Sequence, residues 1–219
     1  MKPYYFTLAI VLIGHFAYAG TSMHRDTTIK PPVVKETKGG QETFIAIEQV
    51  PEFPGGLPAL GSYISHSLKY PEVARLIGIN GRVMVTFTVD TTGRVTNVTP
   101  INCIGAGCEA EAARVLENSP LWKPGIQKGR PVNVKYAVPI TFSSPGGKVQ
   151  FKDLKKSSYG FVFEIKSKRY TLTEAKELLG DSFKSEDVQI AEPFYNADNN
   201  DKFDIPGKTG IYLILMKDK

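Results

Sequence analysis

One stretch of strict alternation places the strongest limit on the fold. Between residues 132 and 142 an apolar side chain stands at every second position, namely Val132, Val134, Tyr136, Val138, Ile140 and Phe142. A period of two predicts a β-strand with one buried face. Pro139 lies near the end of this strand and has no N–H to donate, which favours a strand at the edge of a sheet. An exposed edge is a place where another chain can add a strand.

The patterns before this strand predict alternating helices and strands. The expected elements are helices over 60–68, 72–77 and 108–116, strands over 83–89 and 94–101, and the strand over 132–142. Glycine at Gly93 permits a tight turn between the two earlier strands. This order predicts an α+β fold for residues 50–143, in which helices cover one face of a small antiparallel sheet.

A second, smaller module is expected after the Pro- and Gly-containing stretch 143–147. Strands over 159–165, 188–194 and 211–216, with a helix over 172–179 after the first, predict a β-α-β-β module within residues 148–219. The role of this module is left open by the sequence.

The first 19 residues have the features of a secretory signal peptide. Lys2 is the only charged residue before Arg25, an apolar run follows, and Ala17 and Ala19 fit the small-residue rule at a cleavage site. The alternative is an uncleaved anchor, although the run is shorter than the roughly 20 residues that span a bilayer. Residues 20–49 contain few large apolar side chains and are predicted to be a flexible tether.

Export would place Cys103 and Cys108 in an oxidising compartment. They are the only two cysteines, and two glycines between them permit a short closed loop, so one disulfide is predicted. Free or partner-linked thiols are the alternative. Two cysteines are too few for a structural zinc site, and no metal is expected.

The composition and motifs argue against nucleic-acid binding and catalysis. The formal net charge of +5 comes from interleaved acids and bases rather than from a basic run. The sequence has no nucleophile elbow, no paired-histidine zinc motif, no phosphate-binding loop and no dinucleotide fingerprint. We expect neither an enzyme nor a bound cofactor.

A basic cluster precedes the alternating strand. Lys123, Lys128 and Arg130, with Lys135 in the strand, have no acid among them. They predict either a solvated turn or an electrostatic contact with a partner segment or a cell-wall polymer. Trp122, the only tryptophan, is expected to pack in the core at the junction of helix and strand.

Residues 50–142 resemble the C-terminal domain of TonB, the periplasmic energy transducer of Gram-negative bacteria, in the form common in Bacteroidetes. The resemblance is carried by Pro51-Glu52-Phe53-Pro54-Gly55-Gly56, Tyr70-Pro71, Gly78-Ile79-Asn80-Gly81-Arg82-Val83, Val89-Asp90-Thr91-Thr92-Gly93, Ala112-Ala113-Arg114-Val115, Trp122-Lys123-Pro124-Gly125 and Val138-Pro139-Ile140. It implies a periplasmic protein whose last strand recruits the TonB box of an outer-membrane receptor. The implied contacts are Val132, Asn133, Val134, Lys135, Tyr136, Ala137 and Val138.

Other functions remain open from the sequence. The same edge could pair with a second copy to make a homodimer, or the protein could contact peptidoglycan as a structural component of the envelope. An uncleaved N-terminal segment would anchor the protein in the inner membrane and permit energy transduction.

Overall fold

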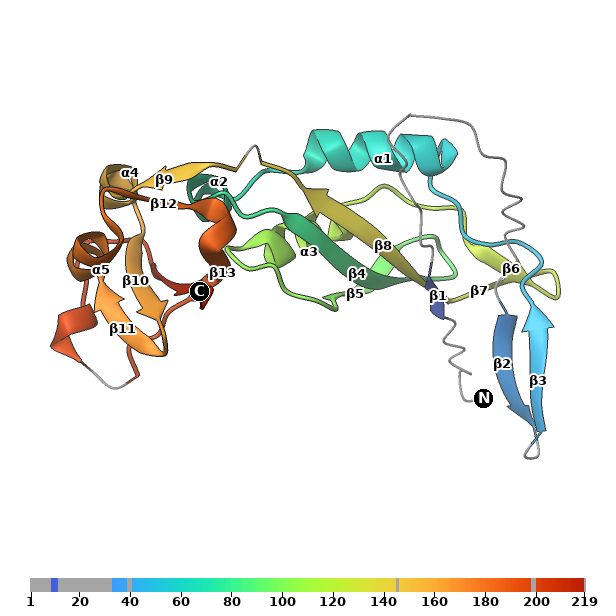
Figure 1. Cartoon of the computed structure of the whole chain (residues 1–219). Helices are drawn as coiled ribbons and strands as arrows, with labels where there is room; N and C mark the ends of the chain where they lie inside the picture. The colour runs from blue at the N-terminus through green and yellow to red at the C-terminus, as the bar shows by residue number, and fades with distance from the viewer. Residues whose placement is uncertain (1–8, 12–32, 39–40, 145, 198–199, 219) are drawn as a thin grey trace, which may run out of the picture. The chain divides into compact units, whose positions relative to one another are not determined.

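The computed structural model describes residues 9–11, 33–38, 41–144, 146–197 and 200–218 (Figure 1). The chain divides into two compact units. The first unit takes in Met1–Leu68, Met84–Ile101 and Ala113–Ile140, and the second Lys69–Val83, Asn102–Ala112 and Thr141–Lys219. The boundary expected at 143–147 differs from this division, because two segments that precede it in sequence cluster with the C-terminal residues.

The first sheet has the strand order β1 (Ala9–Val11), β8 (Val134–Phe142), β4 (Gly81–Val89) and β5 (Val95–Pro100). Strands β4 and β5 are antiparallel and flank the predicted turn, where Gly93 has a φ of 85°. The alternating residues Val83, Val85, Phe87 and Val89 are fully buried. The sheet therefore has the single buried face that the sequence pattern predicts.

Two helices supply apolar cover for this sheet. Helix α1 (Gly56–Ser67) is connected to α3 (Cys108–Glu117) by a hydrogen bond of 2.9 Å from the Tyr63 hydroxyl to the carbonyl oxygen of Val115. Phe53 lies 5.5 Å from both Tyr63 of α1 and Trp122, and Trp122 lies 5.5 Å from Phe87 of β4, measured between ring centroids. These contacts place α1 on the buried face of the sheet, and the predicted α+β class is confirmed.

The structure describes only part of the N-terminal segment for which the sequence makes predictions. Residues 1–8 and 12–32 lie outside the described residues, and with them most of the expected signal peptide. In the segment expected to be a tether, β2 (Val33–Lys38) and β3 (Gln41–Ala46) form an antiparallel pair. Gly39 and Gly40 separate these strands in the sequence, as in many hairpins. None of the helices described is long and apolar enough to cross a membrane.

The second unit contains α2 (Glu72–Ile77) and a sheet of four strands. Helix α2 ends at Gly78, whose left-handed φ of 70° suits glycine. The strand order is β11 (Lys168–Thr171), β10 (Gly160–Ile165), β14 (Ile211–Met216) and β13 (Val188–Pro193), with β10 parallel to β14 and the other pairs antiparallel. Strands β10, β13 and β14 and helix α5 (Leu172–Leu179) lie where the sequence predicts three strands and a helix, and β11 is an additional strand between β10 and α5.

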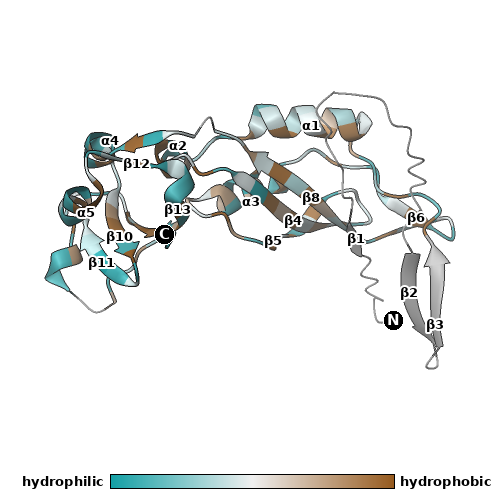
Figure 2. Ribbon diagram, viewed as in Figure 1, coloured by the Kyte–Doolittle hydropathy of each residue, from teal (hydrophilic) through white to brown (hydrophobic). Residues whose placement is uncertain are grey.

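Further short elements complete this unit. Strands β9 (Lys148–Gln150) and β12 (Ser182–Lys184) pair with each other, and α4 (Phe151–Lys156) follows β9 directly. Two short 3₁₀ helices, η1 (Ser185–Asp187) and η2 (Asp201–Phe203), lie in the loops. The rings of Phe151, Phe163 and Phe183 pack together with centroids 5.4–5.6 Å apart. Figure 2 shows hydrophilic residues along α4 and α5 and hydrophobic ones along β10.

The predicted disulfide is not present. Cys103 and Cys108 are free thiols, and their environments differ: Cys103 is exposed, whereas Cys108 is fully buried as the first residue of α3. Burial is also the main reason that the pKa of the Cys108 thiol is raised to about 12. The spacing of the two residues permits a closed loop, but here it separates one surface position from one core position.

Candidate strand-addition edge

The strand predicted over 132–142 is in fact two strands. Val132 belongs to β7 (Arg130–Val132), which pairs with β6 (Gly125–Gln127), and β8 begins at Val134. Asn133 lies between them, and its side-chain oxygen accepts a hydrogen bond of 3.1 Å from the backbone N–H of Thr91. Val132 and Asn133 are therefore not part of β8, because the hairpin with β6 takes up the first residues of the alternating run.

Strand β8 is bordered on both sides. Its neighbours are β4 and the short parallel strand β1, which pairs Ala9, Ile10 and Val11 with Lys135, Tyr136 and Ala137 respectively (Figure 1). The outermost strand on this side is thus β1 rather than β8, which corrects the expectation of an open edge at these residues. Val138 and Pro139 lie beyond the paired stretch.

One face of β8 is anchored in the core. The predicted inward residues Val134, Tyr136, Val138, Ile140 and Phe142 are all buried. Ala137 is buried as well, so the alternation of burial is interrupted where β1 pairs. Lys135 is half-buried.

Tyr136 fixes this face most specifically. Its ring lies 5.9 Å from that of Phe87 and 5.6 Å from that of Trp122, between centroids. Its hydroxyl donates a hydrogen bond of 2.6 Å to the carbonyl oxygen of Pro51, and burial raises the pKa of the phenol to about 12. A buried hydroxyl with a partner orients the side chain as well as filling space.

Trp122 packs in the core as predicted, with 4% of its surface exposed. Its indole N–H donates to the hydroxyl of Ser119 at 3.2 Å, and its backbone N–H donates to the carbonyl of Gly93 at 2.8 Å. A Cβ atom at position 93 would lie 1.9 Å from the carbonyl oxygen of Trp122. The turn between β4 and β5 can approach this residue only because Gly93 has no side chain.

The basic cluster near the edge has acidic partners from elsewhere in the chain. The Lys123 ammonium lies 2.9 Å from the Glu52 carboxylate, and both side chains are exposed. The backbone N–H groups of Lys128 and Gly129 donate to the Glu48 carboxylate at 2.9 and 3.1 Å. Sequence reasoning missed these partners because they lie more than 70 positions away, on a segment that bridges to 123–126.

Arg130 is exposed, as are Lys123 and Lys128, and it lies in β7. No group of three or more His, Cys, Asp or Glu side chains that could hold a metal occurs within the described ranges. The structural features of this region are thus a core-anchored strand, an added parallel strand and a few surface charges.

Comparison with known proteins points to one family. Residues 66–144 match the family model described as the Gram-negative bacterial TonB protein C-terminal, so this part of the chain is a TonB C-terminal domain. The solution structure of the Helicobacter pylori TonB C-terminal domain matches with 22% sequence identity and a TM-score of 0.30, covering 39% of this chain and 90% of that one. A search of curated proteins found no match.

Proposed function

We propose, from the premise that residues 66–144 form a TonB C-terminal domain, that this protein is an exported binding module for outer-membrane receptors. An extended receptor segment, the TonB box, would add to the edge of β8 and pair with its backbone. Main-chain hydrogen bonds would supply affinity, and the side chains that flank the added strand would select its register.

The observation that carries this proposal is the pairing of β1 with β8. Lys135, Tyr136 and Ala137 already accept a strand of three residues in parallel orientation on the side opposite β4. The backbone groups on this side are thus accessible to an extended segment, and the core contacts of Tyr136 hold them in position.

In the full chain the edge of β8 is occupied by β1, which lies within the predicted signal peptide. Residues 9–11 precede the expected cleavage site after Ala19, so export to the periplasm would remove β1. The receptor segment would then take the place that β1 leaves. Arg130 would be the favoured basic contact, because Lys123 is already paired with Glu52.

Calorimetric titration with a TonB-box peptide tests the proposal. The chain that begins at Gly20 should bind the peptide, and the full chain should bind it more weakly because β1 competes. The peptide is then N-methylated at alternate residues, which removes backbone donors without altering the protein. One alternate set should abolish binding and the other should be tolerated, since only every second N–H of a strand faces a given neighbour.

Two results would contradict receptor binding by strand addition. Equal affinity for both methylated peptides would show that no backbone ladder forms. A stable dimer of the chain from Gly20, seen by sedimentation and unable to bind the peptide, would instead support an assembly function in which the edge pairs with a second copy.

A further inference from the structure

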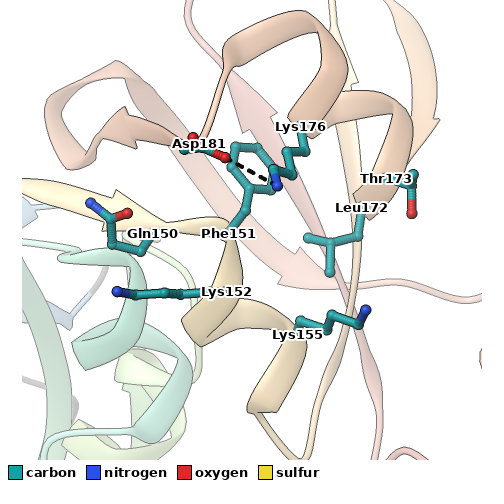
Figure 3. A pocket seen from close by; sticks show the side chains of 8 residues that line it. All are labelled: Gln150, Phe151, Lys152, Lys155, Leu172, Thr173, Lys176 and Asp181. Carbon is teal, nitrogen blue, oxygen red and sulfur yellow. Dashed lines mark ion pairs between the residues drawn. The ribbon is translucent and has the colours of Figure 1, made fainter.

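A second site lies in the other unit, between α4 and α5. A cavity of about 520 Å³ opens there, and its lining includes Lys152 and Lys155 of α4 and Lys176 of α5 (Figure 3). Nothing in the proposed function uses this cavity. Its volume is in the range of pockets that hold small organic molecules.

The charges on this cavity are unbalanced. Asp181 is the one carboxylate among the lining residues, and Lys176 already pairs with it at 3.0 Å. Lys152 and Lys155 have no carboxylate within ion-pair distance in the part of the chain that the structure describes. Two exposed lysines among the lining residues, whose side chains extend in different directions from α4 (Figure 3), therefore attract negative charge from solution.

The floor of the cavity is apolar. Phe151 has 2% of its surface exposed and packs against Phe163 and Phe183, and Leu172 lines the cavity at the first residue of α5. Apolar side chains beside lysines in one cavity favour an anion that also carries a small apolar group, because such a ligand gains from burial as well as from charge.

The helices that carry the lysines are held by other contacts. At the start of α5, the N–H of Glu174 donates to the Thr171 hydroxyl at 3.3 Å, and the Glu174 carboxylate accepts the N–H of Thr171 at 2.9 Å. The other carboxylate oxygen of Glu174 pairs with Lys202 at 2.8 Å. Glu174 is thus engaged with these partners and is not among the residues that line the cavity.

A fourth lysine, Lys208, contacts the C-terminal end of α4. The Lys208 ammonium donates to the backbone carbonyl oxygens of Lys155 and Ser157, at 3.4 and 2.5 Å. It thereby satisfies carbonyl groups at the negative end of the helix.

We propose that this cavity binds a small organic anion, in which one phosphate or carboxylate group is joined to an apolar ring or a short alkyl chain. The ammonium groups of Lys155 and Lys176 contact the anionic group, and the Thr173 hydroxyl donates a hydrogen bond to it. Phe151 and Leu172 contact the apolar part. This site is independent of strand addition at β8.

Titration of the full chain with phenyl phosphate, followed by NMR shifts of the lining residues, tests the proposal. Inorganic phosphate supplies the charge alone and benzyl alcohol the ring alone, and benzoate replaces the phosphate by a carboxylate. Phenyl phosphate should bind about fivefold or more tightly than inorganic phosphate, since burial of a ring adds to the electrostatic attraction. Benzyl alcohol should not bind measurably.

Matched variants distinguish binding at a defined site from a general effect of positive charge. Lys155→Gln and Lys176→Gln should each weaken phenyl phosphate binding by about five- to tenfold, the loss expected for one charged contact. Lys156→Gln removes the same charge from the next residue of α4, which does not line the cavity, and should change affinity by less than about twofold. Thr173→Asp should abolish binding without unfolding α5, because an acid is favourable in the first turn of a helix.

Two outcomes would overturn this inference. One is the absence of phenyl phosphate binding by a protein whose circular dichroism shows that it is folded. The other is equal weakening by Lys155→Gln and Lys156→Gln, which would indicate a diffuse charge effect and no defined site.

Discussion

The hydroxyl of Tyr136 donates a hydrogen bond of 2.6 Å to the carbonyl oxygen of Pro51, a residue 85 positions earlier in the chain. Pro51 belongs to a segment that also bridges Gln49 to Ile126 and Glu52 to Lys123. The candidate edge strand is therefore tied through its buried face to the segment that precedes α1. A partner strand that adds to β8 would meet a backbone that is already held in place.

Tyr136→Phe removes this hydrogen bond and little else. We expect the free energy of unfolding to fall by about 1–2 kcal/mol, because the buried carbonyl of Pro51 loses its donor. Urea denaturation measures this change. Tyr195→Phe is the matched control: Tyr195 is 83% exposed, and its substitution should change stability by less than about 0.5 kcal/mol. Equal effects of the two changes would show that the bond to Pro51 contributes nothing specific.

The same tyrosine predicts a loss of stability in alkali. Burial raises the pKa of Tyr136 to about 12 in the folded state, above its ordinary value of 10.0. The folded state therefore keeps the proton where the unfolded state releases it, so stability is retained below pH 10 and declines between about pH 10 and 12. The stability advantage of the natural protein over Tyr136→Phe should shrink across this window, as measured by urea denaturation at each pH. An advantage that is constant from pH 8 to 12 would contradict the burial of this hydroxyl.

Gly93→Ala should be far more damaging than the same change at Gly129. A Cβ atom at position 93 would lie 1.9 Å from the carbonyl oxygen of Trp122, whereas nothing lies within 4 Å of a Cβ at position 129. Both glycines have positive φ, so backbone strain of roughly 1 kcal/mol is common to both. We expect Gly93→Ala to cost at least about 2 kcal/mol more, because the core must shift around Trp122. Thermal unfolding of both variants measures the difference, and equal melting temperatures would contradict the close approach.

The elements that the sequence predicted correctly are those whose signal is local. Helix α2 follows Pro71 and ends at Gly78, and the turn after β4 needs the positive φ of Gly93. The break between β7 and β8 at Asn133 has no such local signal, so the sequence did not predict it. The period of two continues from Val132 to Val134, while the pairing partner changes from β6 to a strand of the main sheet.

The sequence also could not show which charged residues have partners, because those partners are distant in the chain. Lys123 and Lys128 have no acid nearby in the sequence, yet Glu52 and Glu48 reach them through the bridge between 49–52 and 123–126. The basic cavity also depends on tertiary placement, since Lys155 and Lys176 come from different helices. Helix α4 has only six residues, too few for a clear helical period.

Gly105→Ala tests the contact between strand β13 and the loop that joins Cys103 to Cys108, both in the second unit. The N–H of Ala106 donates to the carbonyl oxygen of Ala191 in β13 at 2.5 Å, and a Cβ atom at position 105 would lie 2.4 Å from that same oxygen. We expect the variant to break this hydrogen bond and to raise amide hydrogen exchange at Ala106 by at least about tenfold. Gly107→Ala is the control: it also has positive φ, but its nearest contact would be 3.7 Å away. Equal exchange at Ala106 in both variants would contradict the contact.

The lowered pKa of Glu174 predicts that the folded state loses stability at acid pH. Its pKa is lowered to about 2, first by the hydrogen bond from Lys202 and then by the backbone N–H of Thr171 at the start of α5. Because the folded pKa lies below the ordinary value of 4.5, this contribution is complete above that value and is lost as the pH falls from about 4.5 toward 2. Glu174→Gln keeps an oxygen that can accept from Thr171 but cannot ionise. In urea denaturation, the advantage of the natural protein over Glu174→Gln should disappear within this window. Lys202→Gln should reduce the same advantage near neutral pH, and an advantage independent of pH between 2 and 5 would show that the Lys202 pair does not hold this carboxylate ionised.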